Sequence, residues 1–176
     1  SHELGDFEKS IFYLKKSLAI FEKYGDPRWL ASLYYNLSQV YLDADQPDLA
    51  REFLEKAFAL RREIEDNKTR FYIYLGFAEL FAKLGNAERA LKNAEKALEL
   101  VRDEGGGKEL ALGQKALAKA LMINGNYEEG KKHYENSIEL FEKLDAKFQL
   151  ARAKMELASM EIDHLEKKEG ERETLR

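Results

Sequence analysis

The sequence contains no cysteine and only two prolines among its 176 residues. Without cysteine, the chain has neither a disulfide nor a thiolate nucleophile or metal ligand. Valine and threonine, which favour strands, are also scarce, whereas alanine, leucine, glutamate and lysine are abundant. Unbranched side chains lose little rotamer freedom in a helix, and few prolines interrupt the helices here. We therefore predict an all-α protein.

The chain also lacks a strong excess of either charge, since 29 basic and 33 acidic residues leave a formal net charge of -4. Nucleic-acid binders normally show a basic stripe, so we predict no nucleic-acid partner. No apolar run approaches the length of a membrane span, and the N-terminal residues do not resemble a signal peptide. We therefore predict a cytoplasmic protein without membrane contact.

A pattern of small and apolar residues recurs with a period of 40 residues. The turn positions are Gly5, Asp45, Gly85 and Gly125. Small residues follow at Ser10, Ala50, Ala90 and Gly130, and again at Ser17, Ala57, Ala97 and Ser137. Spacings of three and four residues place these small side chains on one face of a helix, where a second helix can approach closely. At Gly130 we expect room for a methyl group, so that an alanine there should stabilise the helix.

A second pattern precedes each turn. Tyr34-x-x-Leu37-Ser38-x-x-Tyr41 recurs in residues 74–81 and 114–121, and more weakly in residues 154–161. Each unit therefore consists of a first helix, a tight turn and a second helix.

This combination of positions resembles the tetratricopeptide (TPR) repeat over roughly residues 5–162. The period is 40 rather than 34, and the proline near the end of the second helix is missing. Longer repeats of this kind resemble those of kinesin light chains, Leu-Gly-Asn-type spindle proteins and MalT-like regulators. HEAT repeats share the period but would not explain the small-residue positions. The resemblance implies a right-handed α-solenoid of antiparallel helix pairs with about eight helices.

The expected organisation is a single solenoid over residues 1–166, followed by a charged tail at 167–176. It comprises a half-repeat at 5–25, full repeats at about 27–65, 67–104 and 107–144, and a terminal helix at about 147–166. We expect Asp26, Asp66 and Asp145 to cap helix starts. The half-repeat suggests a fragment of a longer protein. It also suggests self-association through an apolar stripe in residues 7–21, formed by Phe7, Ile11, Leu14, Leu18 and Phe21.

By resemblance, the first helices line the concave surface, and their exposed face is the candidate peptide groove. The strongest candidates are Tyr35, Asn36, Gln39, Tyr72, Glu79, Lys83, Lys115, Lys119, Arg152 and Met155. Further positions on this face are Ser32, Leu75, Gly76, Leu112 and Met122. Amides, tyrosines and charges suit an extended peptide, and the four cations among them suggest a modest preference for acidic sequences.

Nothing in the sequence indicates catalysis, a cofactor or a metal. His133 lies without convergent ligands and is expected at the surface, and Gly105-Gly106-Gly107-Lys108 lacks the other residues of a phosphate loop. We therefore predict a non-enzymatic module that binds a peptide or helix of a partner protein. One alternative is a sensor segment of a multidomain transcription factor, kinase or cyclase that takes a small ligand or signalling peptide. Another is a self-associating architectural repeat.

Overall fold

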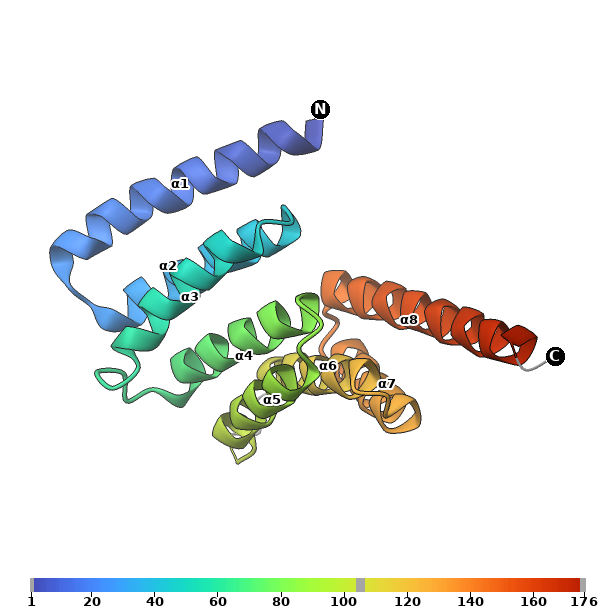
Figure 1. Ribbon diagram of the computed structural model, residues 1–176. Helices are drawn as coiled ribbons and strands as arrows, with labels where there is room; N and C mark the ends of the chain where they lie inside the picture. The colour runs from blue at the N-terminus through green and yellow to red at the C-terminus, as the bar shows by residue number, and fades with distance from the viewer. Residues whose placement is uncertain (1, 104–106, 175–176) are drawn as a thin grey trace.

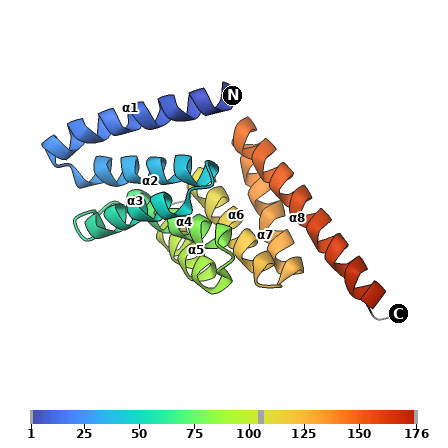
Figure 2. The ribbon, with the colours of Figure 1, turned by 45° about the horizontal axis from the view of Figure 1, so that its top comes forward.

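The computed structural model describes residues 2–103 and 107–174, with side chains described from residue 8 onward. Every element of this part is helical, and no strand occurs in it. The helices are α1 (His2–Tyr24), α2 (Pro27–Asp43), α3 (Pro47–Leu60), α4 (Asn67–Lys83), α5 (Ala87–Val101), α6 (Gly107–Ile123), α7 (Tyr127–Lys143) and α8 (Lys147–Thr174). They follow one another in a curved row with α1 and α8 at its ends (Figures 1 and 2). The predicted all-α solenoid is confirmed.

Helix pairs α2–α3, α4–α5 and α6–α7 make the most extensive contacts in the described structure. We call α2, α4, α6 and α8 the inner helices, and α1, α3, α5 and α7 the outer helices. The small residues Ala50, Ala57, Ala90, Ala97 and Ser137 are fully buried. Apolar side chains that alternate with them fill the core between the paired helices.

The tight turns within the repeats use left-handed backbone, as expected. Gly85 and Gly125 have φ angles of +70° and +90°, and Asp45 takes the same role with a φ of +57°. Aspartate tolerates this conformation better than most residues other than glycine. Pro47 then begins α3, where its missing amide hydrogen costs nothing.

Two of the three expected helix caps are present. The Asp26 carboxylate accepts a hydrogen bond from the Arg28 amide at 2.9 Å, and Asp66 accepts one from Thr69 at 2.8 Å. The expectation for Asp145 is wrong. Its φ of +49° places it in the left-handed turn after α7, the conformation that Gly25 adopts after α1.

The end helices differ from the expected boundaries. Helix α1 begins at His2, so Gly5 lies within a helix instead of in a turn, and α8 continues to Thr174 through most of the expected tail. The side chain of Phe7 and residues 105 and 106 of the glycine joint lie outside the described part. None of the described helices is both long and apolar enough to cross a membrane.

Candidate functional site

The inner helices surround a hollow of about 480 Å³. It is lined by Ser32, Tyr35, Asn36, Gln39, Tyr72, Glu79, Lys108, Leu112, Lys115, Phe141, Phe148, Gln149 and Arg152. A second hollow of about 210 Å³ shares Gln39, Glu79, Lys115 and Arg152 with the first, and adds Lys83 and Lys119 among others. Because they share these four residues, we treat the two hollows as one surface and call it the concave groove.

The structure brings most of the predicted groove residues together, including all the strongest candidates except Met155. Met155 lines neither hollow and is 73% exposed. The prediction that Leu75 lies on the groove face is also wrong, because Leu75 is fully buried in the core. Met122 lies near a different hollow, at the α6–α7 turn.

Gly76 is buried and does not present a surface to a ligand. A Cβ atom at this position would lie 2.4 Å from Cδ2 of Leu54 and 3.2 Å from Cδ2 of Tyr35. The glycine therefore permits α4 to approach α3 closely. The sequence suggested a groove position because Gly76 shares the repeat position of Asn36, which is exposed.

One wall of the groove is aromatic. The rings of Tyr35 and Tyr72 lie 5.1 Å apart, and the Tyr72 hydroxyl donates a hydrogen bond to Oε1 of Glu109 at 2.9 Å. Lys68 forms an ion pair with the same carboxylate at 3.0 Å. Burial, followed by the interaction with Glu109, raises the pKa of the Tyr72 hydroxyl, so it stays protonated. These contacts orient the Tyr72 ring along the groove.

Three of the four predicted cations are paired with carboxylates. Lys115 lies 3.1 Å from Glu156, and Arg152 contacts both Glu156 at 3.0 Å and Asp43 at 3.2 Å. The contact between Arg152 and Asp43 joins α8 to the end of α2. Lys83 pairs with Asp45 at 3.1 Å. Among these four predicted cations, only Lys119 has no ion-pair partner in the described part of the chain, so the predicted basis for a general acidic preference is reduced to one cation. Lys108, which the prediction did not include, also lines the groove.

Two polar atoms at the base of the groove are buried without a hydrogen-bond partner of ordinary geometry. They are Nε2 of Gln39 and Oε2 of Glu79, and both residues line both hollows. Burial raises the pKa of Glu79, although Lys115, Arg152, Lys119 and hydrogen bonding with the Gln39 side chain act in the opposite direction. An unpaired buried donor or acceptor costs roughly 1–3 kcal/mol. A ligand would bond this pair by replacing the contact that the two side chains make with each other.

Sequence reasoning missed several residues of the groove. Glu156 occupies the repeat position of Asn36, and Asp43 that of Lys83, so their phase could have indicated both. Phe148 and Gln149 enter because α8 curves toward α2, which depends on the packing angles between repeats. Phe141 belongs to an outer helix, and no periodicity assigned it to the groove.

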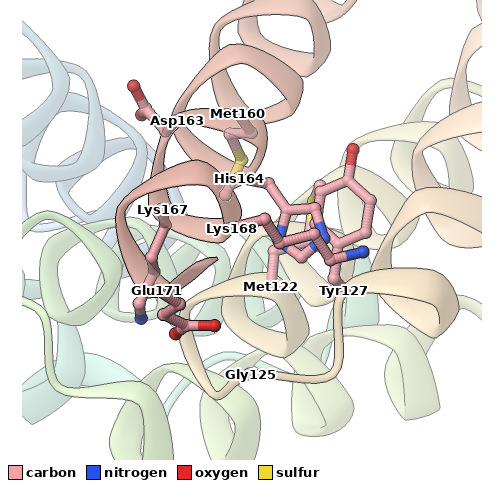
Figure 3. A pocket seen from close by; sticks show the side chains of 9 residues that line it. All are labelled: Met122, Gly125, Tyr127, Met160, Asp163, His164, Lys167, Lys168 and Glu171. Carbon is pink, nitrogen blue, oxygen red and sulfur yellow. The ribbon is translucent and has the colours of Figure 1, made fainter. Parts of the chain in front are cut away.

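Another hollow, of about 300 Å³, lies between the α6–α7 turn and α8 (Figure 3). The Tyr127 and His164 rings form one side and are stacked in parallel with centroids 3.7 Å apart. Met122 and Met160 contribute thioethers, and Lys167 lies on α8 beyond them. The charged side chains here are exposed, Tyr127 and His164 are half-buried, and none of them is buried without a partner.

Two of the three histidines, His133 and His164, have described side chains, and neither lies in a group of metal-binding side chains. His133 is half-buried rather than at the surface, and its Nδ1 lies 2.5 Å from Oε1 of Gln114. Across the described residues, no group of three or more histidine, aspartate or glutamate side chains is arranged to hold a metal ion.

Solved structures with the same architecture come from several lineages. The chain shares 27% identity with a signal-transduction ATPase with a tetratricopeptide-repeat sensor from Pyrococcus horikoshii, at a TM-score of 0.68 over 92% of this chain and 24% of that one. It shares 17% with aspartyl phosphate phosphatase F from Bacillus subtilis, at a TM-score of 0.70 over 93% of this chain and 45% of that one. The chain thus spans less than half of either protein.

A third structure is covered more completely. A putative kinesin light chain with nearly identical TPR-like repeats from Podosopora anserina shares 19% identity, at a TM-score of 0.62 over 92% of this chain and 86% of that one. No match was found among curated protein sequences. Models of the tetratricopeptide repeat match residues 2–63 and 116–144, which together make up more than half of the chain. This chain belongs to the tetratricopeptide-repeat family.

Proposed function

We propose that this chain is a non-enzymatic interaction module that holds an extended segment of a partner protein in its concave groove. The observation that carries the proposal is the polar base of that groove, where Gln39 and Glu79 lie against each other and their Nε2 and Oε2 atoms make no hydrogen bond of ordinary geometry. A donor beside an acceptor matches a peptide group or a side-chain carboxamide, each of which offers one of both.

The rest of the groove supports a ligand that is polar along its length. Tyr35 and Tyr72 offer an apolar wall for one side chain, whereas Lys119 acts on Glu79 and Glu156 without forming an ion pair with a carboxylate of the described chain. We therefore expect a segment whose main chain or carboxamide contacts Gln39 and Glu79, with a single acidic group near Lys119. A densely acidic segment would instead meet Asp43, Glu79 and Glu156.

A displayed library of random peptides tests this proposal. Peptides selected by the protein should bind the Gln39→Leu variant roughly tenfold more weakly or worse, because a bonded polar group would be lost. Lys119→Ala should weaken chiefly the peptides that carry an acidic residue. Glu139→Ala, at an exposed position on outer helix α7, is the matched control and should bind normally. Selected peptides that bind Gln39→Leu as well as the parent would refute the groove assignment.

Self-association through α1 is a second candidate function, and specific exposures favour it. Tyr13, Ile20 and Tyr24 are 66%, 56% and 75% exposed, which is unusual for three large apolar side chains on one helix. Of the apolar stripe expected in residues 7–21, Ile11, Leu14, Leu18 and Phe21 pack toward α2. The exposed side chains thus form a separate face.

A sensor segment of a larger signalling protein is the remaining candidate, and the similarity to the sensor-bearing ATPase from Pyrococcus horikoshii favours it. The same groove would then take a small ligand. Isothermal titration with peptides selected in the library experiment would separate the two cases. A groove that binds short fragments as tightly as whole segments would support the sensor assignment.

A further inference from the structure

Helix α8 carries an exposed apolar stripe on the side that faces away from α7. Its members are Phe148, Ala151, Met155, Ala158, Ile162 and Leu165, whose spacing alternates between three and four residues. This spacing keeps the whole stripe on one helix face. At the positions of Ala151 and Ala158 the other inner helices are covered. Ala111 and Ala118, one repeat before Ala151 and Ala158, are fully buried.

Outer helix α1 has a corresponding uncovered face. Ser10 is exposed, whereas Ala50 and Ala90 at the same repeat position are fully buried. Tyr13 is 66% exposed, but its equivalent Phe53 is only 8% exposed because it stacks on Tyr41 of the paired inner helix. The face of α1 that an inner helix of the same repeat would cover is therefore open.

The complete repeats show how such faces pair. In α6–α7, Tyr134 packs in one cluster with Ala118, Phe141 packs with Ala111, and a Cβ on Gly130 would meet Met122. In α4–α5, Ala97 shares a cluster with Leu75. In α6–α7, then, each large residue on one helix meets a small one on the other.

The same register matches α8 with α1 of a second copy. Leu14 and Phe21 occupy the positions of Tyr134 and Phe141. Both are only partly buried against α2, and their remaining surface would meet the small residues Ala158 and Ala151. The small residues Ser10 and Ser17 occupy the positions of Gly130 and Ser137. They would meet the large residues Ile162 and Met155. Sizes therefore alternate in a complementary way along the whole contact.

Charge and the ends of the two helices agree with this register. It places Lys9 opposite Asp163 and brings Tyr24 to Phe148, which are 75% and 73% exposed in the single chain. Opposite charges across a helix pair and mutual burial of two rings both favour association. Helices α1 and α8 lie at opposite ends of the row, so one chain can present both faces at once (Figure 1).

We propose that copies of this chain join head to tail, with α8 of one copy and α1 of the next forming an inner–outer helix pair like α6–α7. The inference rests on the self-association proposed above and names its counterpart surface. Such an interface is heterologous, so it grows into open chains unless its rotation closes a ring. The occupant of the α8 stripe is therefore a second copy of this chain.

Sedimentation velocity on two blocking variants and their mixture tests the proposal. Tyr13→Glu blocks the α1 face and Ala158→Arg blocks the α8 face, and both side chains are exposed, so each variant should keep the helical content and melting temperature of the parent. The parent should gain mass with concentration, and each variant alone should stay monomeric. The equimolar mixture should stop at a 1:1 dimer, because only one intact α1 face meets one intact α8 face.

Matched controls lie one residue away on other faces. Phe12→Glu removes a ring that is 53% exposed and whose equivalents are the solvated Glu52 and Lys92, and Ser159→Arg adds the same charge at the repeat position of Lys119. Both controls should associate like the parent. If the Ala158→Arg variant alone still associates, α1 pairs with something other than α8 and this inference fails while self-association stands. A parent that is monomeric at every concentration, or a mixture that forms no dimer, overturns both.

Discussion

The middle repeats and the two end helices use the same residue pattern but differ in what covers it. Leu54 on α3 is fully buried between two inner helices, whereas Leu14 at the equivalent position of α1 is only half-buried against one. On α8, Ala158 is exposed where Ala118 on α6 has no accessible surface. In a repeat protein each unit is stabilised by its neighbours, so identical residues contribute unequally. Stability should therefore fall from the middle toward the ends.

The largest expected effect comes from truncating the same residue in the two settings. Leu54→Ala removes a side chain with no room to relax and should cost about 2–5 kcal/mol of unfolding free energy. Leu14→Ala, at a side chain that is already partly exposed, should cost about 1–2 kcal/mol. Urea unfolding followed by circular dichroism measures both. Equal losses would mean that α1 is covered as completely as α3.

Replacing Gly130 by alanine should destabilise the protein, although alanine normally favours a helix more than glycine does. Its Cβ would lie 2.4 Å from Cγ of Met122 and 2.8 Å from the carbonyl oxygen of Ala118, and the backbone oxygen cannot move aside cheaply. We expect Gly130→Ala to destabilise the protein by about 1–3 kcal/mol. Gly170→Ala is the control, since nothing lies within 4 Å of that site on α8, and it should stabilise by up to about 1 kcal/mol.

Two aspartates at helix boundaries should respond in opposite directions. Asp66 caps α4 through the amides of Lys68 and Thr69, so Asp66→Ala should cost about 0.5–2 kcal/mol. Asp145 holds a φ of +49°, so Asp145→Gly should be neutral or stabilise by up to about 1 kcal/mol. Thermal melting of both variants decides this. A loss of stability in Asp145→Gly would assign the carboxylate a bonding role.

The register of the helices could be predicted from the sequence because it depends on local rules. Glycine at 85 and 125 marks backbone that few other residues adopt, and the small residues at 50, 57, 90 and 97 mark close helix approach. These features repeat at a fixed period, so the assignments support one another. The position of Tyr35 or Lys119 on the inner face follows directly from that register.

The details of the groove depend on packing between distant helices. Gly76 and Asn36 share a repeat position, yet one is buried against Leu54 and the other lies in the groove. The pairing of Arg152 with Asp43 requires the curvature of the whole row, which no local pattern specifies. Gly130 misled the sequence reasoning for the same reason, because the side chain of Met122 fills the space above it.

The smallest expected effect is a difference between two carboxylates of the groove, Glu79 and Glu156, in how the stability of the folded protein depends on pH. Burial raises the pKa of Glu79, so between its unfolded and folded pKa values the folded protein binds more protons, and stability falls as pH rises. Glu79→Gln should therefore stabilise the protein near neutral pH by roughly 1 kcal/mol or less, with no gain at pH values below both the unfolded and the folded pKa of Glu79.

Burial acts against ionisation of Glu156 as well, but Lys115 and Lys119 outweigh it and hold its pKa below the ordinary value. Glu156→Gln should lose stability near neutral pH, and that loss should shrink as acid protonates the parent. Urea titrations at neutral and acidic pH, compared with the parent, measure both signs. If both variants shift stability in the same direction, the groove does not separate the two carboxylates as its geometry requires.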